Sequence, residues 1–366
     1  MKGNTCCLLL MILLSTIGVS AQKRKVIIDQ DARGPATTDQ QSILMFLQSP
    51  EVETLGITVV SGDQWRDEEV AHTLRMLELT GHTNVKVYPG AVFPLINNRE
   101  EMHRWQALYG KVVYQGAWND HAPPPSVESA KKQPWRLIPY HDPFVVPSLP
   151  EGNPSLRPET EDAAHFMIRM VHQYPHEVTI YAGGPLTDLA QAISLDPHFP
   201  ELAQELVVMG GSIAPVVPMN WAQENRREFN FWFDPEATHI VLRAPWPKVT
   251  VTTVDISIKT HMTQTMIDQI AKAATPTAQY IGKWADEEYL WDELATAAWL
   301  DPSVITKQEK VYLDIDISHT ASYGNTLVWT EGNQPGLGER LVNLQDDLDL
   351  NKFNKMVIDL LSKGEQ

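Results

Sequence analysis

Two patterns of hydrophobic and polar positions alternate along the chain, and they predict alternating strands and helices. Short apolar runs, typical of strands buried on both faces, occupy Lys25–Asp29, Thr54–Val60 and Val85–Tyr88. Apolar residues at helical spacing separate these runs, over Thr38–Ser49 and Asp67–Leu79. This order of strand, helix, strand, helix and strand indicates a parallel sheet with helices on its faces.

The alternation is interrupted at 123–158, which holds ten of the 26 prolines. Proline disfavours helix interiors and central strands, so we expect a long ordered loop or lid there. Beyond it we predict further elements: a helix at Glu161–Tyr174, strands at Val178–Ala182, Leu206–Gly210 and Val249–Val254, a helix at Tyr289–Leu300, a hairpin of Val311–Ile317 with Thr326–Thr330, and a helix at Asn351–Leu361. The expected fold is therefore α/β, a mainly parallel central sheet flanked by helices, with a C-terminal hairpin and a proline-rich loop insertion, as one domain over residues 22–366.

The first 21 residues have the pattern of a secretory signal peptide. Lys2 precedes an apolar stretch at Leu8–Val19, and small residues end the segment at Ala21. We therefore expect a secreted or periplasmic protein with no stable membrane insertion after the signal is removed. The only cysteines, Cys6 and Cys7, lie within this segment, so the remaining chain forms no disulfides.

The net negative charge of the chain excludes two classes of binding partner. The chain has 46 acidic residues against 29 Lys and Arg, a net charge of −17 with His neutral. Such a surface repels nucleic acid and anionic membranes, so neither is expected as a partner. Solubility explains an acidic surface in general, and a more specific explanation is that some of the acids hold a cation.

Several acids and one glycine pair lie where predicted parallel strands end or a helix begins. Ligands of such sheets bind outside the carboxyl ends of the strands, so these positions are candidates for a site: Asp29, Asp31, Asp63, Gly183, Gly184, Asp255 and Asp292. Converging carboxylates repel one another unless a cation lies between them, and Ca²⁺ takes six to eight oxygen ligands. Zinc fits poorly, because cysteine is absent and no paired His has ligand spacing. Alternatively, Asp31 and Asp39 only cap a turn and a helix start.

Six successive motifs resemble those of the inosine–uridine-type nucleoside hydrolases. They occur in that family's order and span nearly all of Lys25–Leu361, as "VIIDQD…TDQQSILMFL", "GITVVSGD", "YAGGPLTDLAQAI", "VVMGGS", "EFNFWFDPEA" and "WDELATAAWLDP". The resemblance implies hydrolysis of the N-glycosidic bond of a nucleoside and a homodimer or homotetramer. It implies a calcium ion held by Asp31, Asp39, Asp292 and the main-chain carbonyl of Gly183. The ribose hydroxyls would be bound by Glu228 and Asn230, with Asp63, Met209 and Asn220 beside them.

One departure from the family pattern concerns the base that activates water. Alignment of the helix makes Asp39 the metal ligand and puts Thr38 where the family has its catalytic aspartate. Threonine cannot act as a base near neutral pH. If Asp39 is the base instead, Gln40 stands at the position of the metal ligand, and the helix aligns less well with the family pattern. We favour Asp63 as the substitute base, with Asp29 as the second choice. Otherwise the metal alone activates the water, or ordinary nucleosides are not hydrolysed.

A second departure concerns the leaving base. Trp291 precedes Asp292 where much of the family has His, and tryptophan is typical of the purine-preferring branch. Its ring would stack on the base as part of the catalytic set, although core packing at a helix start is the alternative. A second stacking ring is expected among Trp65, Trp105 and Trp118. His141, in the proline-rich segment, is a further candidate acid.

These features favour a secreted, calcium-dependent hydrolase of purine ribonucleosides that serves base salvage. A second hypothesis keeps the site and changes the substrate to another ribosyl or glycosyl compound. A third is a non-catalytic protein that binds a nucleoside or sugar, because Thr38 replaces the usual base.

Overall fold

The structure is a computed structural model that describes residues 22–119, 140–213 and 227–364. The predicted signal peptide, Asn220 and residues 123–139 of the proline-rich region lie outside these ranges. The described remainder of that region, 140–158, contains no helix or strand. This agrees with the loop predicted from its prolines.

Nine strands form one sheet in the order β3-β2-β1-β4-β5-β6-β9-β7-β8. Their bounds are β1 Arg24–Gln30, β2 Val52–Val59, β3 Val87–Pro89, β4 Val178–Ala182, β5 Glu205–Met209, β6 Val249–Thr252, β7 Ile305–Ile315, β8 Thr326–Trp329 and β9 Arg340–Leu348. Neighbouring strands from β3 to β9 in this order run parallel, whereas β7 is antiparallel to both β9 and β8. The predicted mainly parallel sheet with a C-terminal hairpin is confirmed.

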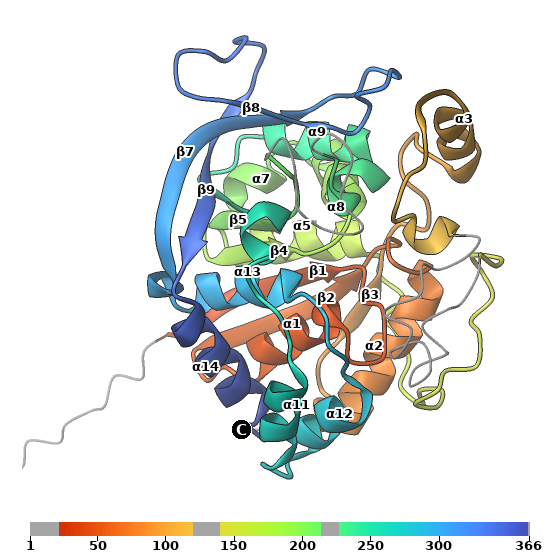
Figure 1. Cartoon of the computed structure of the whole chain (residues 1–366), viewed down its shortest axis with the longest axis vertical. Helices are drawn as coiled ribbons and strands as arrows, with labels where there is room; N and C mark the ends of the chain where they lie inside the picture. The colour runs from red at the N-terminus through yellow and green to blue at the C-terminus, as the bar shows by residue number, and fades with distance from the viewer. Residues whose placement is uncertain (1–21, 120–139, 214–226, 365–366) are drawn as a thin grey trace, which may run out of the picture.

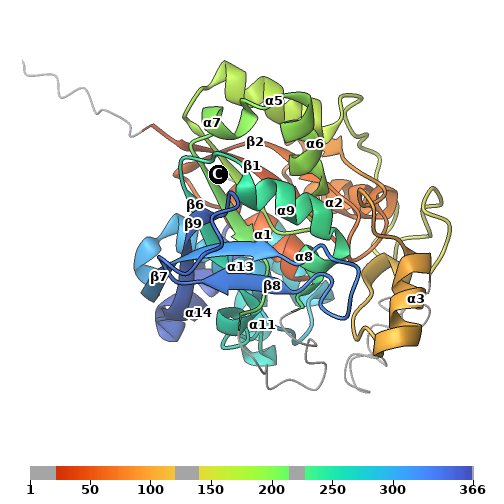
Figure 2. The same cartoon turned by 90° about the horizontal axis from the view of Figure 1, so that it is seen from above.

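Helices cover both faces of this sheet (Figures 1 and 2). On one face lie α1 Thr38–Leu47, α2 Arg66–Thr80, α11 Gln264–Ala271, α12 Pro276–Trp284, α13 Trp291–Leu300 and α14 Leu350–Leu361. On the other lie α5 Ala163–Gln173, α6 Thr187–Leu195, α7 Phe199–Leu202, α8 Phe229–Phe233 and α9 Pro235–Arg243. The remaining described helices are α3 Arg99–Tyr109, η1 Gly116–Trp118, α10 Val254–Ser257 and η3 Pro302–Val304. None of the described helices is long and apolar enough to cross a membrane.

Two hydrophobic cores flank the sheet, and β1 contributes to both. Val26 and Ile28 pack in the core on the α1 side, whereas Ile27 packs on the α5 side. Successive side chains of a strand point to opposite faces, so a strand covered on both faces is apolar throughout. This is why the buried parallel strands are recognisable as continuous apolar runs.

The structure adds elements that the apolar pattern did not predict. β9 lies between β6 and β7; its sequence, RLVNLQDDL, alternates imperfectly, and its register with β7 shifts between Ile305 and Gln308. α3 buries only Met102 among its residues, so its sequence gives a weak helical pattern. The predicted strand at Val249–Val254 is too long, because β6 ends at Thr252 and α10 follows. Asp255 therefore lies in a helix, where its carboxylate accepts a hydrogen bond from the Ile213 N–H at 2.8 Å.

Candidate active site

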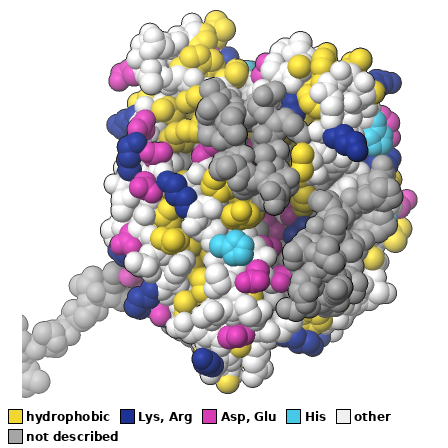
Figure 3. Space-filling model, in the orientation of Figure 1, with side chains coloured by type: hydrophobic (Ala, Val, Ile, Leu, Met, Phe, Trp, Pro, Cys, Tyr) yellow, Lys and Arg dark blue, Asp and Glu magenta, His cyan; other side chains and the backbone are white. Residues whose placement is uncertain are grey.

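Three predicted metal ligands enter the carboxyl-end edge of the sheet from different elements. Asp31 follows β1, Asp39 lies in the first turn of α1, and Asp292 lies in the first turn of α13. All three are buried, and the Asp31 carboxylate interacts electrostatically with those of Asp39 and Asp292. A side chain at Gly183 would lie 2.6 Å from Asp292 Oδ1, and one at Gly184 would lie 2.9 Å from Asp31 Oδ1. The fold thus brings the acids and the glycine pair into one small region. On the face of the molecule drawn in Figure 3, acidic side chains lie in a recess.

Burial makes this cluster costly to ionise. It raises the pKa of Asp31 and of Asp39 well above the ordinary range, and neighbouring carboxylates, above all that of Asp63, raise both further. Burial also raises the pKa of Asp292 to about 7, against hydrogen bonds from Gln30 and Thr38 that favour its ionised form. A bound cation would reverse these shifts because it favours the charged carboxylates.

The donor types of this cluster suit a hard cation. Every candidate ligand is an oxygen, and the Gly183 carbonyl, which accepts a hydrogen bond from Asn230 Nδ2 at 2.9 Å, keeps a second lone pair. Among the described residues, no three His, Cys, Asp or Glu side chains stand ready as a metal cluster. The residues therefore fit Ca²⁺ by their chemistry, and binding would require their carboxylates to close around the ion.

Thr38 joins α1 to α13 by hydrogen bonds. Its Oγ1 lies 2.6 Å from Glu293 Oε2 and 3.2 Å from Asp292 Oδ2, and it accepts a hydrogen bond from the Asp292 N–H at 3.2 Å. The hydroxyl thus satisfies polar groups of two buried acids. It offers no proton acceptor of useful basicity to a water molecule.

Asp63 is the candidate base with an adjacent cation. It follows β2, its side chain is 15% exposed, and its N–H donates to Asp31 Oδ2 at 3.0 Å. Its Oδ2 lies 3.6 Å from Arg33 Nε, and Tyr114 hydrogen-bonds to the carboxylate. Burial raises the pKa of Asp63, whereas Arg33 and Tyr114 act to lower it.

Asp29 has different surroundings from the other candidate acids. Its carboxylate is fully buried, accepts a hydrogen bond from Thr58 Oγ1 at 2.6 Å and is hydrogen-bonded to Asp188 of α6. Burial and the neighbouring Asp188 raise its pKa well above the ordinary range. Asp29 therefore ties the end of β1 to β2 and α6, where it is enclosed by protein groups.

The predicted ribose-binding residues lie at the ends of β5 and α8. Glu228 is the N-cap of α8 and accepts backbone hydrogen bonds from Asn230, Phe231 and Gly211 at 2.9, 3.1 and 2.8 Å. Besides its bond to Gly183, the Asn230 amide donates to the Met209 carbonyl at 3.2 Å. The "EFNFWFDPEA" motif thus folds as two capped helices, since Asp234 caps α9 in the same way.

The predicted aromatic groups lie in different surroundings: Trp291 directly precedes Asp292, Trp118 is buried, and Trp105 is only partly buried. Trp291 begins α13 and packs against Tyr289, with ring centroids 4.9 Å apart. Trp118 stacks on Phe233 at 4.3 Å, and the face of Trp105 is covered by the Arg227 guanidinium at 4.1 Å.

Trp65 and His141 join the proline-rich segment to α2. Trp65 is buried and donates to the His141 carbonyl at 2.9 Å. His141 Nε2 lies 2.9 Å from Glu68 of α2, and this hydrogen bond raises the pKa of His141. Its imidazole is therefore already engaged with a buried carboxylate.

Sequence reasoning missed four charged groups of this region. Glu69 and Glu293 are fully buried, and Asp188 pairs with Asp29, but each stands in an ordinary helical pattern. Arg33 stands in the loop between two predicted ligands. A basic residue in an otherwise acidic stretch is the one signal that could have identified any of them.

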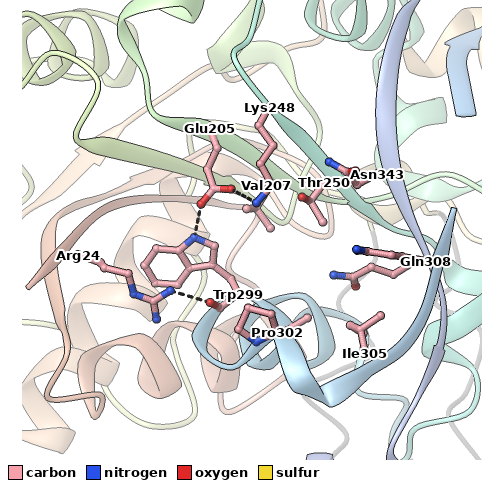
Figure 4. A pocket seen from close by; sticks show the side chains of 12 residues that line it. Arg24, Glu205, Val207, Lys248, Thr250, Trp299, Pro302, Ile305, Gln308 and Asn343 are labelled. Carbon is pink, nitrogen blue, oxygen red and sulfur yellow. Dashed lines mark hydrogen bonds and ion pairs between the residues drawn. The ribbon is translucent and has the colours of Figure 1, made fainter. Parts of the chain in front are cut away.

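A cavity of about 260 Å³ lies at the opposite end of the sheet (Figure 4). It is lined in part by Arg24 and Glu205, the first residues of β1 and β5. Glu205 accepts hydrogen bonds from Trp299 Nε1 and Lys248 Nζ at 2.8 and 2.7 Å, and Arg24 donates to the Trp299 carbonyl at 2.8 Å. Its charged groups are thus paired with their neighbours, and it is separate from the acids of the candidate site.

Comparison with known proteins agrees with this arrangement. The family model described as inosine-uridine preferring nucleoside hydrolase matches residues 26–355. Uridine nucleosidase 1 of Arabidopsis thaliana is 26% identical over 92% of this chain and 93% of its own length. The pyrimidine-specific ribonucleoside hydrolase of Citrobacter koseri is 26% identical over 90% of this chain and 95% of its own length.

Solved structures show the same fold. The purine-preferring ribonucleoside hydrolase from Gardnerella vaginalis superposes with a TM-score of 0.69 at 21% identity, covering 93% of this chain and 99% of that one. A structure described as an inosine-guanosine nucleoside hydrolase gives a TM-score of 0.69 at 22% identity, with 92% and 98% covered.

Proposed function

Because the chain belongs to the inosine-uridine preferring nucleoside hydrolase family, we propose that it hydrolyses the N-glycosidic bond of purine ribonucleosides with the help of Ca²⁺. The observation that carries this proposal is the convergence of Asp31, Asp39, Asp292 and the Gly183–Gly184 turn at the carboxyl-end edge of the sheet.

The proposed reaction exchanges the base for water at the anomeric carbon. The water oxygen forms a bond to C1′ while the bond from C1′ to the base nitrogen breaks, and its electron pair leaves with the base. Asp63 takes the proton from the water, because it is the candidate acid that combines an adjacent cation with partial exposure. Asp29 is less suited, because Thr58 and Asp188 enclose its carboxylate.

Other residues bind and orient the substrate in this proposal. Glu228 and Asn230 accept and donate hydrogen bonds at the ribose hydroxyls, and Met209 packs beside them. Asp31, Asp39, Asp292 and the Gly183 carbonyl would hold the cation. When bound, Ca²⁺ supplies positive charge that orients water and lowers its pKa.

The purine preference rests on Trp291. Its indole lies at the start of α13, directly before Asp292, and its neighbour Tyr289 supplies a second ring at 4.9 Å. An aromatic pair at the start of the helix that carries Asp292 favours a large, flat leaving group. The named relatives differ in the substrate they take, since the Arabidopsis and Citrobacter proteins act on uridine or pyrimidine ribonucleosides and the Gardnerella protein prefers purines.

The proposal also covers where the protein acts and its oligomeric state. The signal peptide in residues 1–21 would send the protein out of the cytoplasm, where released bases become available for import and salvage. We also propose a homodimer or homotetramer, which light scattering on the purified protein tests directly.

The test is release of base from single nucleosides by protein lacking residues 1–21. Inosine, adenosine, guanosine, uridine and cytidine are incubated with enzyme in Ca²⁺ or in chelator. Faster release from the three purine nucleosides in Ca²⁺ supports the proposal. Release from uridine and cytidine alone refutes the purine preference, and no release from any of the five refutes nucleoside hydrolysis.

Thr38 favours a second candidate, a protein that binds a nucleoside or sugar without turnover. Its hydroxyl is engaged with Glu293 and Asp292 where the resemblance expects a base. This candidate predicts that inosine or ribose raises the melting temperature and is recovered unchanged. Release of base during the same experiment excludes it. A screen of other ribosyl and glycosyl compounds tests the remaining alternative, a changed substrate.

A further inference from the structure

Arg227 is a buried cation directly before Glu228 of the proposed ribose site, and its side chain is only 1% exposed. Its Nε and Nη2 donate hydrogen bonds to the carbonyls of Tyr323 and Ala321 at 3.2 and 3.0 Å. Both acceptors belong to the β7–β8 segment, residues 316–325, which lies beside α8 and α3 (Figure 2). A charge buried this deeply is costly unless such bonds hold it, so the guanidinium fixes the chain before α8 to this segment.

The Trp105 ring of α3 borders the same guanidinium on another side. The Arg227 guanidinium carbon lies 4.1 Å from the centroid of the indole ring, and Trp105 Nε1 donates to the Thr320 carbonyl at 2.9 Å. A tryptophan face suits a planar guanidinium better than an ammonium group. Arg227 is thus held by α3 and by the β7–β8 segment at the same time.

The β7–β8 segment is itself tied to α8 and α9. Tyr323 is buried, and its hydroxyl lies 3.0 Å from both carboxylate oxygens of Glu236 in α9. Gly324 has a φ of +80°, and a Cβ there would lie 2.6 Å from Cδ1 of Trp232 in α8. Glycine is the residue that adopts this conformation readily and allows so close an approach. The segment that binds Arg227 is therefore fixed to the two helices that follow Glu228.

Glu228 depends on this anchor because the helix that it caps is short. α8 has five residues, and so short a helix is unstable without contacts outside itself. Glu228 has an extended backbone, with φ −116° and ψ 150°, so its side chain and that of Arg227 leave the chain on opposite sides. The guanidinium reaches the β7–β8 segment, where the Arg227 backbone also forms an antiparallel bridge with Asn325. The carboxylate on the other side accepts the Gly211 N–H, just after β5.

From these contacts we infer that Arg227 is a positioning residue for ribose recognition, which fixes the chain directly before Glu228 and so holds the Glu228 carboxylate toward a ribose hydroxyl. The inference rests on the proposed hydrolysis and adds a residue to which the family resemblance gives no role. Arg227 need not touch the substrate, because it acts through Glu228. Without the guanidinium, the carbonyls of Tyr323 and Ala321 lose a donor and the chain at residue 227 loses its anchor. A shift of about 1 Å in a positioning group costs up to about 10²-fold in rate.

The test measures recognition of each ribose hydroxyl separately. The nucleoside that the wild type hydrolyses fastest is compared with its 2′-, 3′- and 5′-deoxy derivatives, and each comparison gives a ratio of two kcat/KM values. These ratios do not depend on how much of a variant is folded, because the same enzyme sample acts on both compounds. Glu228→Gln should lower the ratio for the hydroxyl that Glu228 binds. Arg227→Met, an unbranched side chain without the guanidinium, should lower that same ratio at least about threefold and leave the other two within about twofold of wild type.

Arg243→Ala is the matched control. Arg243 of α9 also joins a helix to the C-terminal strands, through hydrogen bonds to Asp314 of β7 at 2.9 and 2.7 Å, but it does not adjoin Glu228 in the chain. Its variant should keep all three ratios within about twofold of wild type. Trp105→Leu, which removes the stacked ring, should lower the same ratio as Arg227→Met by a smaller factor. Arg227→Lys should fall between Arg227→Met and the wild type.

Three outcomes overturn the inference: all three Arg227→Met ratios within about twofold of wild type, an equal fall in all three, or Glu228→Gln ratios that match the wild type. If Arg227→Met does not fold, Arg227→Lys and Trp105→Leu carry the same decision. A wild-type protein without turnover refutes the proposed function instead. In that case crystal structures of the wild type and of whichever of these variants folds decide, and a Glu228 carboxylate in an unchanged place overturns the positioning role.

Discussion

Replacing Thr38 by the aspartate that the family resemblance expects is predicted to destabilise this protein. The new carboxylate would replace a hydroxyl that lies 2.6 Å from Glu293 Oε2 and 3.2 Å from Asp292 Oδ2. Both neighbours are fully or nearly fully buried, and burial raises the pKa of each. A third carboxyl group would enter with only the Asp292 N–H, 3.2 Å from the present hydroxyl, as a backbone donor.

The size of the effect follows from two limits. Two unit charges 4 Å apart repel by about 4 kcal/mol at an effective dielectric constant of about 20. The new group can avoid this by taking a proton, which at pH 7 costs about 4 kcal/mol for an acid with an ordinary pKa near 3.9. We therefore expect Thr38→Asp to lower the free energy of unfolding by about 2–4 kcal/mol at pH 7.

The pH dependence has a definite sign. The folded-state pKa of the new acid lies above its unfolded value, so the folded protein binds the proton more tightly and the loss of stability grows as pH rises. At pH 5 protonation costs at most about 1.5 kcal/mol, which caps the loss there. We therefore expect Thr38→Asp to lower the free energy of unfolding by a large amount at pH 7 and by a small amount at pH 5.

Urea unfolding in chelator at pH 5, 6 and 7 measures this deficit. Thr38→Asn is the control for size and polarity without charge, and Thr38→Ser is the control that keeps the hydroxyl. The difference between Thr38→Asp and Thr38→Asn isolates the charge. Equal stability of these two variants at pH 7, or a difference that does not shrink at pH 5, would refute the reasoning.

Three further predictions concern the same edge of the sheet. Burial raises the pKa of Asp188 to about 7 from an ordinary 3.8, so the folded protein holds its proton more tightly and stability falls as pH rises through this range. Asp188→Asn should flatten the slope of urea-derived stability by up to about 1.4 kcal/mol per pH unit, and an unchanged slope contradicts the assignment. A Cβ at Gly184 would lie 2.7 Å from the Asp31 backbone nitrogen, so Gly184→Ala should cost about 1–3 kcal/mol in urea unfolding, whereas Gly364→Ala, with only ordinary contacts near 3.6 Å, should stay within about 0.5 kcal/mol. Ca²⁺ should raise the melting temperature of the wild type and leave Asp39→Asn unchanged, and a rise of equal size in both would contradict a role for Asp39 in binding the ion.

The fold was largely predictable because burial on two faces leaves a strong pattern. Val178–Ala182, for example, is buried throughout and largely apolar, with Thr179 as its one aliphatic polar residue, and the strand predicted there has the observed bounds. β9 and α3 were missed for the opposite reason: β9 exposes Leu341, buries Gln345 and has a register shift with β7, and α3 buries Met102 alone. Elements with one thin apolar face differ little in sequence from loops.

The site was predictable as far as parallel-strand topology determines it. Acids that follow a parallel strand or begin the helix after it are expected at one edge of the sheet, and Asp31, Asp39 and Asp292 do meet there. Their second partners were not predictable, because a hydrogen bond such as that of Thr38 with Glu293 joins residues 255 positions apart. Likewise, nothing in the sequence near Tyr114 connects it with Arg33 or Asp63.

The departure from the family pattern at position 38 has an electrostatic explanation. At position 38 an acid would face Asp292 and Glu293, both of which are buried carboxyl groups with raised pKa. After β2 an acid meets the Arg33 guanidinium and the Tyr114 hydroxyl, which favour its charged form. A base must be ionised to accept a proton, so the position of the cation determines where this site can keep one. On this argument the surroundings of position 38 and of the turn after β2 differ in one respect: the Arg33 guanidinium is close to Asp63, whereas the Thr38 hydroxyl faces two buried carboxyl groups.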